Sequence, residues 1–562
     1  MAMRPAHGFA PARRRPRRRL SAATLTAALA LPLLLGACGS HHATKPANRP
    51  TAAPAPPSLH AAPAAADDPN DGGDSTLPPL ARRPVAPAAA RAASKVSVPT
   101  VTTTQAPPTG TSAAPAVPPG CALDGYAAPD PARPVVALTF DLAPDHRSVS
   151  GTEHVRFTPD RSVTELVFRL WPNGPEGYRK DASLRVGTAT SPDALPFRTS
   201  SAGGRPGTQG TLLTIPLGRT APAGEPIEAD LAFTLTLPTA TWDRYGTDGR
   251  TAFWGSGHPM LAWQRDVGWV RDNASPLPGE TQDSEAAATT VAVTAPTGDT
   301  VLAPGAGDDP VPAEPGRTLW RFSADAVRDV AVVVGPLATE SSTMTVAGKN
   351  VRIVAAVAPG LPAAPQNALT TGLLMAETRR ALPVLAATFG PVPFGTIRVV
   401  GVPGIVASGL EYPGMAWVLP QPDAASARVV TTHELAHQWF YALVGNNQAE
   451  HPWLDEAFAT YAESLVDDNA VAYETPLGLD RLDRSMAAFG TDYDLLQSVV
   501  YGTGPTALHA ARAAVGSAAF DAAVRCYVRT NAWSVASPAS VAAAFDELPA
   551  ATAVLRKAGA LP

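Results

Sequence analysis

The chain has 562 residues, including 60 prolines, and its 44 lysines and arginines nearly balance its 49 aspartates and glutamates, for a net charge of −5. The length alone would suggest about three or four domains, but many prolines gather near the start and reduce the part that can fold. The near-neutral balance argues against nucleic-acid partners, which require basic surfaces, and we expect none.

Residues 1–38 have the features of an export signal. Residues 1–19 contain seven arginines and no acidic residue, and an apolar run from Leu20 to Ala37 follows. A basic start, an apolar stretch and small residues before a cleavage site form a secretory signal. The run ends in LGAC, which resembles a bacterial lipobox. We expect Cys38 to carry lipid and to anchor an exported protein on the extracytoplasmic face of the cell membrane. The alternatives are a plain signal peptide and an uncleaved anchor helix.

Residues 39–118 consist mainly of Ala, Pro, Thr and Ser, with almost no aromatic side chains. Such a composition cannot bury enough apolar area to fold, so we expect a disordered tether. Its proline content favours an extended, semi-rigid form.

From residue 119 to about 340, short segments alternate apolar and polar residues in steps of two. Examples are VVALTFDLAP, GTEHVRFTP and ADLAFTLTLP, which are separated by turns rich in Pro, Gly and Asp. This alternation predicts strands with one buried face. We therefore expect a mainly antiparallel β domain over 119–340, without internal repeats.

Helical spacing dominates the region 341–562. The segments VRIVAAVAP and TIRVVGVPG predict two strands, and Ala364 to Phe389 a helix that ends at Gly390. Further helices are expected over 425–444, 454–467, 504–516, 517–530 and 538–548. The fold class is then α+β and multidomain, with a mostly helical second domain.

A metal site is predicted within the segment 431–461. His433 and His437 are four residues apart, so both imidazoles lie on one face of a helix and can bind one zinc ion. Glu434 lies beside them and can take a proton from a metal-activated water. Catalytic zinc needs a third protein ligand. Glu456 near the start of the next expected helix is the candidate.

Two further residues are candidates for substrate recognition and catalysis. Glu411 lies in SGLEYPG, between a strand and a strand-like segment, and a carboxylate at the rim of the cleft could bind the α-amine of a peptide. The alternative is a solvated loop glutamate. Tyr501, just ahead of a helix, could donate to a developing oxyanion, or could simply pack in the core.

Several other polar residues have less specific interpretations. Asp455 could orient a metal ligand or cap the helix that follows, while we expect His451 and His509 to be structural. Cys121 and Cys526 could form a disulfide in an exported protein or remain two separate thiols, and the sequence leaves this open.

The segments HELAHQWF and WLDEAFATY together resemble the gluzincin aminopeptidases, the family of aminopeptidase N and puromycin-sensitive aminopeptidase. The resemblance implies an N-terminal β domain and a thermolysin-like catalytic domain with one zinc. By that match, His433, His437 and Glu456 are the zinc ligands, and Glu434 is the general base.

The same resemblance extends to SGLEYPG, which is similar to the family's Gly-Ala-Met-Glu-Asn motif. It implies that Glu411 binds the substrate's amino terminus, with Tyr412 in place of the asparagine. Tyr501 matches the family's transition-state tyrosine, and Thr503 stands where the family has lysine.

The resemblance implies a membrane-anchored zinc aminopeptidase that acts on peptides. Because the chain ends at Pro562, we expect neither the further β domain nor the large helical domain of longer family members. One alternative is therefore an endopeptidase with an open cleft. Another is a non-catalytic cell-envelope binding or scaffold protein with a structural zinc.

Overall fold

The computed structural model describes residues 121, 125–175, 182–239, 244–277, 284–361, 369–404, 408–467, 477–478 and 480–562. The expected signal at 1–38 and tether at 39–118 lie outside these ranges. Residues Arg82–Pro562 belong to one compact unit. Among the described residues, no helix combines the length and the apolar character that crossing a membrane requires.

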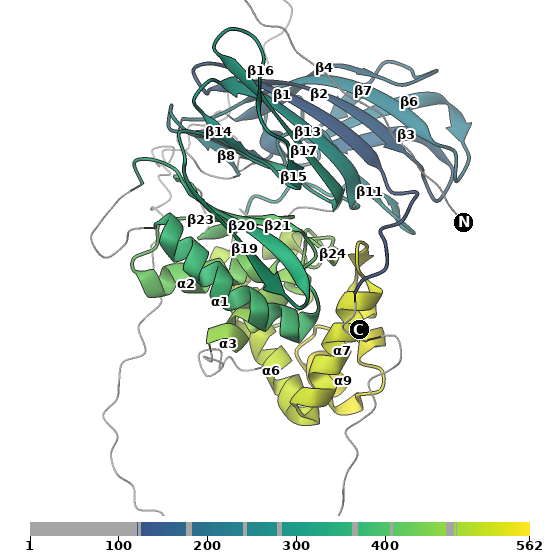
Figure 1. Ribbon diagram of the computed structural model, residues 1–562. Coiled ribbons are helices and arrows are strands. Elements are labelled where there is room, and N and C mark those ends of the chain that lie inside the picture. The colour runs from purple at the N-terminus through teal and green to yellow at the C-terminus, as the bar shows by residue number, and fades with distance from the viewer. Residues whose placement is uncertain are drawn as a thin grey trace, which may run out of the picture. The chain divides into compact units, whose positions relative to one another are not determined.

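The first region consists of β-strands, as the alternating pattern predicted (Figure 1). Strands β1 (Val135–Leu142), β2 (Ser148–Phe157) and β7 (Ile227–Thr236) bury about every second side chain. They lie in an eight-stranded sheet of order β15-β17-β13-β1-β2-β7-β4, with β16 on β17. The other members are β4 (Ser183–Thr190), β13 (Ala287–Pro296), β15 (Ala306–Gly307), β16 (Val311–Pro312) and β17 (Arg317–Val327). Neighbouring strands are antiparallel except for β1 and β13.

Besides the two-stranded sheet of β11 (Trp263–Gln264) and β12 (Gly268–Trp269), the described part of this β region contains two further antiparallel sheets. One has the order β10-β3-β6-β5 and the other β14-β18-β9-β8. Their strands are β3 (Val163–Arg169), β5 (Arg198–Ser200), β6 (Leu212–Ala221), β8 (Tyr245–Thr247), β9 (Ala252–Gly255), β10 (Met260–Leu261), β14 (Thr300–Leu302) and β18 (Ala331–Gly335). Large aromatic side chains, among them Phe140, Phe157 and Trp254, fill the core of the region.

The second region is built on a mixed, five-stranded sheet of order β19-β20-β21-β23-β22. Its strands are β19 (Ala338–Val346), β20 (Lys349–Val357), β21 (Thr396–Gly401), β22 (Gly409–Tyr412) and β23 (Met415–Val418). The three strands β20, β21 and β23 are parallel. Since β19 pairs with β20, the sheet already starts at Ala338, slightly before the expected boundary at 340/341.

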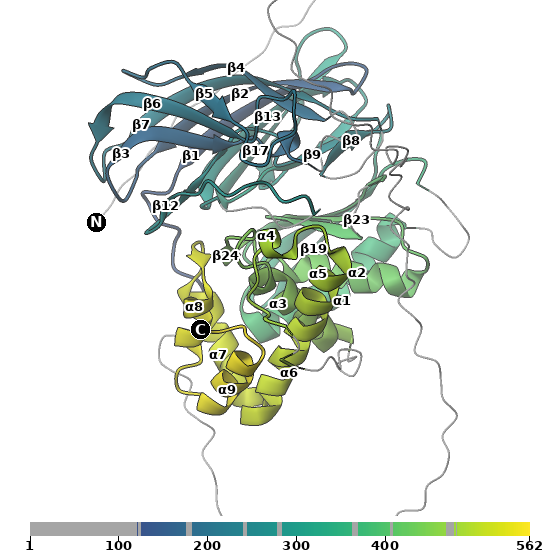
Figure 2. The ribbon, with the colours of Figure 1, turned by 180° about the vertical axis from the view of Figure 1, so that it is seen from behind.

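Helices cover this sheet (Figure 1). Helix α1 (Thr371–Phe389) packs on β19 and β20, and α2 (Ala424–Ala436) packs on β22 and β23. Helix α3 (Trp453–Asp467) contacts both α2 and α6 (Gly504–Val515), as Figure 2 shows from behind. Among the described residues of this region, the remaining helical elements are α4 (Met486–Phe489), α5 (Tyr493–Leu496), the π-helical η4 (Gln497–Thr503), α7 (Ser517–Thr530), α8 (Pro538–Ala544) and α9 (Pro549–Lys557).

Two of the expected helices are shorter in the structure. The helix predicted over 425–444 ends at Ala436, because the chain then turns and Tyr441 takes a φ of 117°, which no helix allows. The helix predicted over 538–548 ends at Ala544, and Pro549 starts the separate helix α9. Proline favours a first helical position and cannot continue the interior of a helix.

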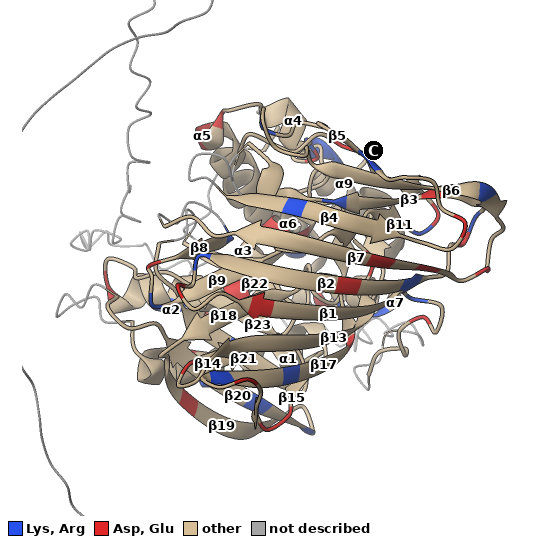
Figure 3. Ribbon diagram, turned by 90° about the horizontal axis from the view of Figure 1, so that it is seen from above, with Lys and Arg blue, Asp and Glu red and all other residues tan. Residues whose placement is uncertain are grey.

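The two regions are joined by an apolar layer and a covalent bond. Phe253 of β9 and Trp417 of β23 pack edge to face, with ring centroids 5.4 Å apart, in a cluster shared by both regions. Cys121, which precedes β1, forms a disulfide with Cys526 of α7, which settles the pairing that the sequence left open. Positive and negative residues are interspersed along the strands (Figure 3).

Candidate active site

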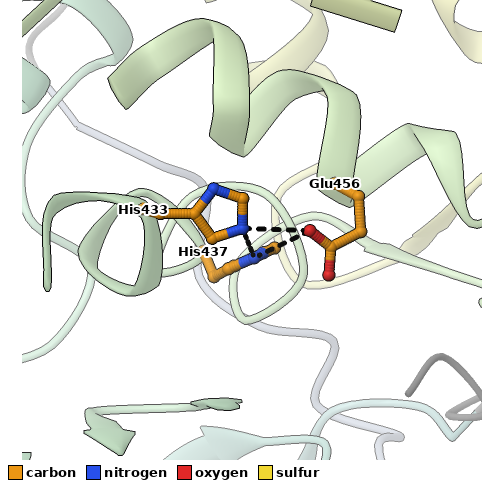
Figure 4. A group of neighbouring side chains, drawn as sticks. All are labelled: His433, His437 and Glu456. Carbon is orange, nitrogen blue, oxygen red and sulfur yellow. Dashed lines mark hydrogen bonds and ion pairs between the residues drawn. The ribbon is translucent and has the colours of Figure 1, made fainter. Parts of the chain in front are cut away.

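The ends of two helices bring the expected metal ligands together. His433 lies in the last turn of α2, His437 directly follows that helix, and Glu456 lies in the first turn of α3. All three side chains point toward one another (Figure 4). Their donor atoms form a group suited to one metal ion.

The spacing of these atoms fits tetrahedral zinc. The distance from His433 Nε2 is 3.1 Å to His437 Nε2 and 3.0 Å to Glu456 Oε2, while His437 Nε2 lies 3.6 Å from that oxygen. Ligands about 2.0–2.1 Å from a tetrahedral zinc stand roughly 3.3 Å from one another. Two imidazoles and one carboxylate are also the donor types that zinc prefers in catalytic sites.

Hydrogen bonds on the far side of each imidazole fix its orientation. His437 Nδ1 donates to the carbonyl of Phe440 at 2.9 Å, so this nitrogen carries the proton and Nε2 faces the other ligands. His433 Nδ1 lies 3.5 Å from Oε2 of Glu463. Partners of this kind orient metal-binding histidines. Glu463 was not predicted from the sequence, although its spacing of two helical turns from Glu456 was an available signal.

The carboxylate of Glu456 dominates the charge of this group. Burial alone would lower the pKa of His437, but Glu456 outweighs it and raises that pKa to about 9. Burial would raise the pKa of Glu456, yet the two histidines hold it well below its usual range. The site therefore favours positive charge, which a bound cation supplies in place of the imidazole protons.

Glu434 lies next to this group with an oxygen available for proton transfer. Its side chain is buried, and its Oε2 has no hydrogen-bond partner among the described residues. Burial, helped by the charges of Glu411 and Glu456, raises its pKa to about 8. Gly409 of β22 makes room for it, since a Cβ at that position would lie 2.3 Å from Glu434 Oε1.

Glu411 lies on strand β22 and not in a solvated loop, so that alternative is wrong. It is only 2% exposed. One of its carboxylate oxygens lies within 4.8 Å of the donor atoms of Glu434 and His437. A buried carboxylate at this distance from the metal-ligand group can receive the ammonium of a peptide whose carbonyl lies at the metal.

A buried glutamine connects Glu411 to α3. Gln448 Nε2 donates to Glu411 at 3.0 Å and to Asp455 at 2.7 Å. Asp455 also accepts from Asn446 Nδ2 at 3.0 Å. Asp455 lies inside the first turn of α3, so it is not the N-cap of that helix. Burial first, and then the charge of Glu456, raises its pKa to about 7.

Tyr501 lies in η4, with its ring beside His433. The two ring centroids are 6.2 Å apart and the planes are inclined by 27°. The π-helical backbone of η4 is of a kind that often occurs at functional sites. Thr503, at the end of the same element, is buried and donates to Ser498 O at 3.4 Å.

His451 and His509 have structural partners outside this group. His451 pairs with Asp483 at 2.7 Å, and His509 hydrogen-bonds with Ser464 at 2.7 Å. The arrangement therefore brings His433, His437, Glu456, Glu434 and Glu411 together, with Tyr501 next to His433.

Part of the chain is similar to known aminopeptidases. Residues 377–555 match the family model described as "Peptidase family M1 domain". The chain is 25% identical over 186 residues to aminopeptidase M1-A of Oryza sativa subsp. japonica, which is 28% of this chain and 21% of that protein. It is 26% identical over 288 residues to aminopeptidase N of Streptomyces lividans, which is 45% of this chain and 33% of that protein.

The fold is that of two-domain M1 metallopeptidases. A crystal structure of an M1 zinc metallopeptidase from Deinococcus radiodurans matches with a TM-score of 0.56 and 22% identity, over 76% of this chain and 92% of that one. A mutant two-domain M1 zinc metallopeptidase bound to L-tryptophan matches with a TM-score of 0.57, 22% identity and coverage of 76% and 94%. The match to the family model covers residues 377–555, and the chain spans about a fifth to a third of the length of the two curated relatives named above.

Proposed function

We propose that this chain is a zinc-dependent aminopeptidase that releases amino-terminal residues from peptides. One observation carries the proposal. The donor atoms of His433, His437 and Glu456 converge at the spacing of zinc ligands, directly beside the buried carboxylates of Glu434 and Glu411. A purely structural zinc site has no use for these two carboxylates. The similarity to M1 aminopeptidases supports the same conclusion.

Each residue then has a defined part in hydrolysis. When bound, zinc would lower the pKa of a water molecule and polarise the scissile carbonyl. Glu434 accepts the proton of the attacking water at its carboxylate and delivers it to the leaving amine. Tyr501 donates from its hydroxyl to the carbonyl oxygen as negative charge develops there. Glu411 holds the ammonium group at the amino terminus of the substrate.

The test separates the base from the ligands. We expect Glu434→Gln to keep its zinc and fold but to lose roughly 10²-fold or more of its turnover, since a positioned acid–base group contributes that much. His437→Ala should lose most of its zinc, as measured by elemental analysis. The substrates are aminoacyl reporters and the matching N-acetylated peptides. The parent should cleave the N-acetylated peptides poorly.

Two outcomes would contradict the proposal. Near-normal turnover by Glu434→Gln would move the general base elsewhere and favour the scaffold alternative. Equal cleavage of free and N-acetylated peptides by the parent would instead favour an endopeptidase.

We also propose that the protein is exported and anchored to the cell membrane by lipid at Cys38. The basic start, the apolar run and LGAC support this location. The disulfide between Cys121 and Cys526 also fits an oxidising compartment. Metabolic labelling with a fatty acid should mark the parent but not Cys38→Ser, and the parent should partition into detergent. Unchanged labelling of the variant would mean that another residue carries the anchor.

A further inference from the structure

Two strained residues meet at one buried carboxylate. Tyr441 has a φ of 117° and Ser256 a φ of 51°, in the region of backbone conformation that favours glycine. Both residues are almost fully buried, and the side chains of both bind Asp329, which immediately precedes Val330 in the β region. Such a conformation is unfavourable for a residue other than glycine and persists only where the surroundings impose it. Strain of this kind often marks functional sites.

Three donors from the β region itself hold the Asp329 carboxylate. Ser256 N and Val330 N donate to Oδ1 at 3.1 and 2.6 Å, and Ser256 Oγ donates to Oδ2 at 2.6 Å. A further donor is the hydroxyl of Tyr441, at 3.3 Å from Oδ2. The hydrogen bonds from Ser256 and Val330 therefore hold the Asp329 carboxylate in place independently of Tyr441.

Tyr441 sits in the turn that holds the metal ligand His437. The side chain of His437 donates through Nδ1 to Phe440 O at 2.9 Å, and its carbonyl accepts from Ala442 N at 2.9 Å. Tyr441 lies between these two partners, and its own N–H donates to Val444 O at 2.8 Å. A displacement of Tyr441 would thus move both residues that hold His437.

We propose that Tyr441 and Asp329 are positioning residues for the metal site. The bond between hydroxyl and carboxylate fixes the turn 437–444, and through Phe440 it fixes the rotation of the His437 imidazole. The β region thereby contributes to the geometry of the metal site without a metal ligand of its own. This inference rests on the proposed function and adds to it the residues that hold the second histidine in place.

The experiment compares two changes of tyrosine to phenylalanine in the full chain. Tyr441→Phe removes only the hydroxyl that reaches Asp329. Tyr245→Phe is the matched control, since its buried hydroxyl donates to Trp171 O at 3.4 Å within the β region. The readouts are the rate of zinc release to a chelator, and kcat and KM measured separately.

We expect Tyr441→Phe to release zinc roughly tenfold faster and to lose a similar factor in kcat, with KM unchanged, as fits the loss of a hydrogen bond to a charged group. Tyr245→Phe should match the parent in all three measurements. Asp329→Asn should likewise speed the release of zinc and lower kcat. The double variant should be no worse than the more impaired single one, because both changes break one contact.

Zinc release and kcat at parental values in Tyr441→Phe would overturn the inference, as would fully additive effects in the double variant. Either result leaves the proposed function intact, because the parent still binds zinc and hydrolyses peptides. A parent that binds zinc but cleaves no peptide would instead refute the proposed function. Zinc release would still test the positioning contact in that case.

Discussion

Gln448 uses one amide nitrogen to hold two carboxylates that belong to different elements, Glu411 on β22 and Asp455 on α3. The cluster of His433, His437 and Glu456 and the proposed role of Glu411 could be predicted from the sequence, because fixed helical spacing and a resemblance to known motifs mark these residues. Gln448 could not, since it lies in the segment between α2 and α3, where no spacing rule applies. Its role depends on how the sheet and the helix approach each other, which is a property of the folded chain.

Gln448→Leu provides a test at this scale. The change removes the amide nitrogen, and with it both hydrogen bonds, while keeping a side chain of similar size. A hydrogen bond to a charged group contributes about 1.5–3 kcal/mol. We expect kcat/KM for peptides with a free amino terminus to fall roughly tenfold to a hundredfold, with zinc content unchanged. Parental kinetics in this variant would show that Glu411 does not need the amide.

At the scale of elements, the end of α2 is the main difference between expectation and structure. Residues 437–444, of which 439–444 are apolar or aromatic, were expected to continue the helix, but they turn and become buried instead. The spacing of apolar residues along the sequence shows that a segment is buried. It does not show whether the segment continues a helix or turns to pack against another element. The start of α3 was easier to predict, because the segment from Leu454 onward keeps a helical pattern in its core-facing residues.

The close packing of strand β22 against helix α2 can be tested by a substitution that adds one methyl group on β22. In Gly409→Ala, the added Cβ would lie 2.3 Å from Glu434 Oε1, so the carboxylate must move. A misplacement of about 1 Å can cost roughly 10²-fold in rate. We expect such a loss in kcat with zinc retained, as measured by steady-state kinetics and elemental analysis.

Gly395→Ala is the matched control, because a Cβ there has no atom of the other described residues within 4 Å. If both alanine variants keep parental turnover, the contact between β22 and Glu434 has no catalytic importance.

At the scale of the whole molecule, the order of the regions followed from the change in sequence periodicity, from steps of two to helical spacing. The contacts between the two regions could not be predicted from this periodicity. The layer around Phe253 and Trp417 joins strands far apart in the sequence, and the two cysteines of the disulfide are separated by 405 residues. No local pattern specifies partners at such distances.

Removing the disulfide should therefore lower global stability. Crosslinks of this kind typically contribute about 2–4 kcal/mol, mainly by restricting the unfolded chain. We expect Cys121→Ser with Cys526→Ser to unfold at lower denaturant concentration by an amount that corresponds to this range. The zinc content of the folded double variant should not change. An unfolding midpoint equal to that of the parent would mean that the bond adds nothing to stability.

The same bond determines where mechanical load enters the molecule. In the proposed anchored form, any pull from the membrane travels along the chain and reaches Cys121 before it reaches β1. At Cys121 the load can pass through a covalent link directly into α7, because Cys526 lies on that helix. The hydrogen bonds between β1 and its neighbours form a softer, parallel path. Tension on the tether is thus carried into the helical region, and the strands at the start of the β region are shielded from peeling.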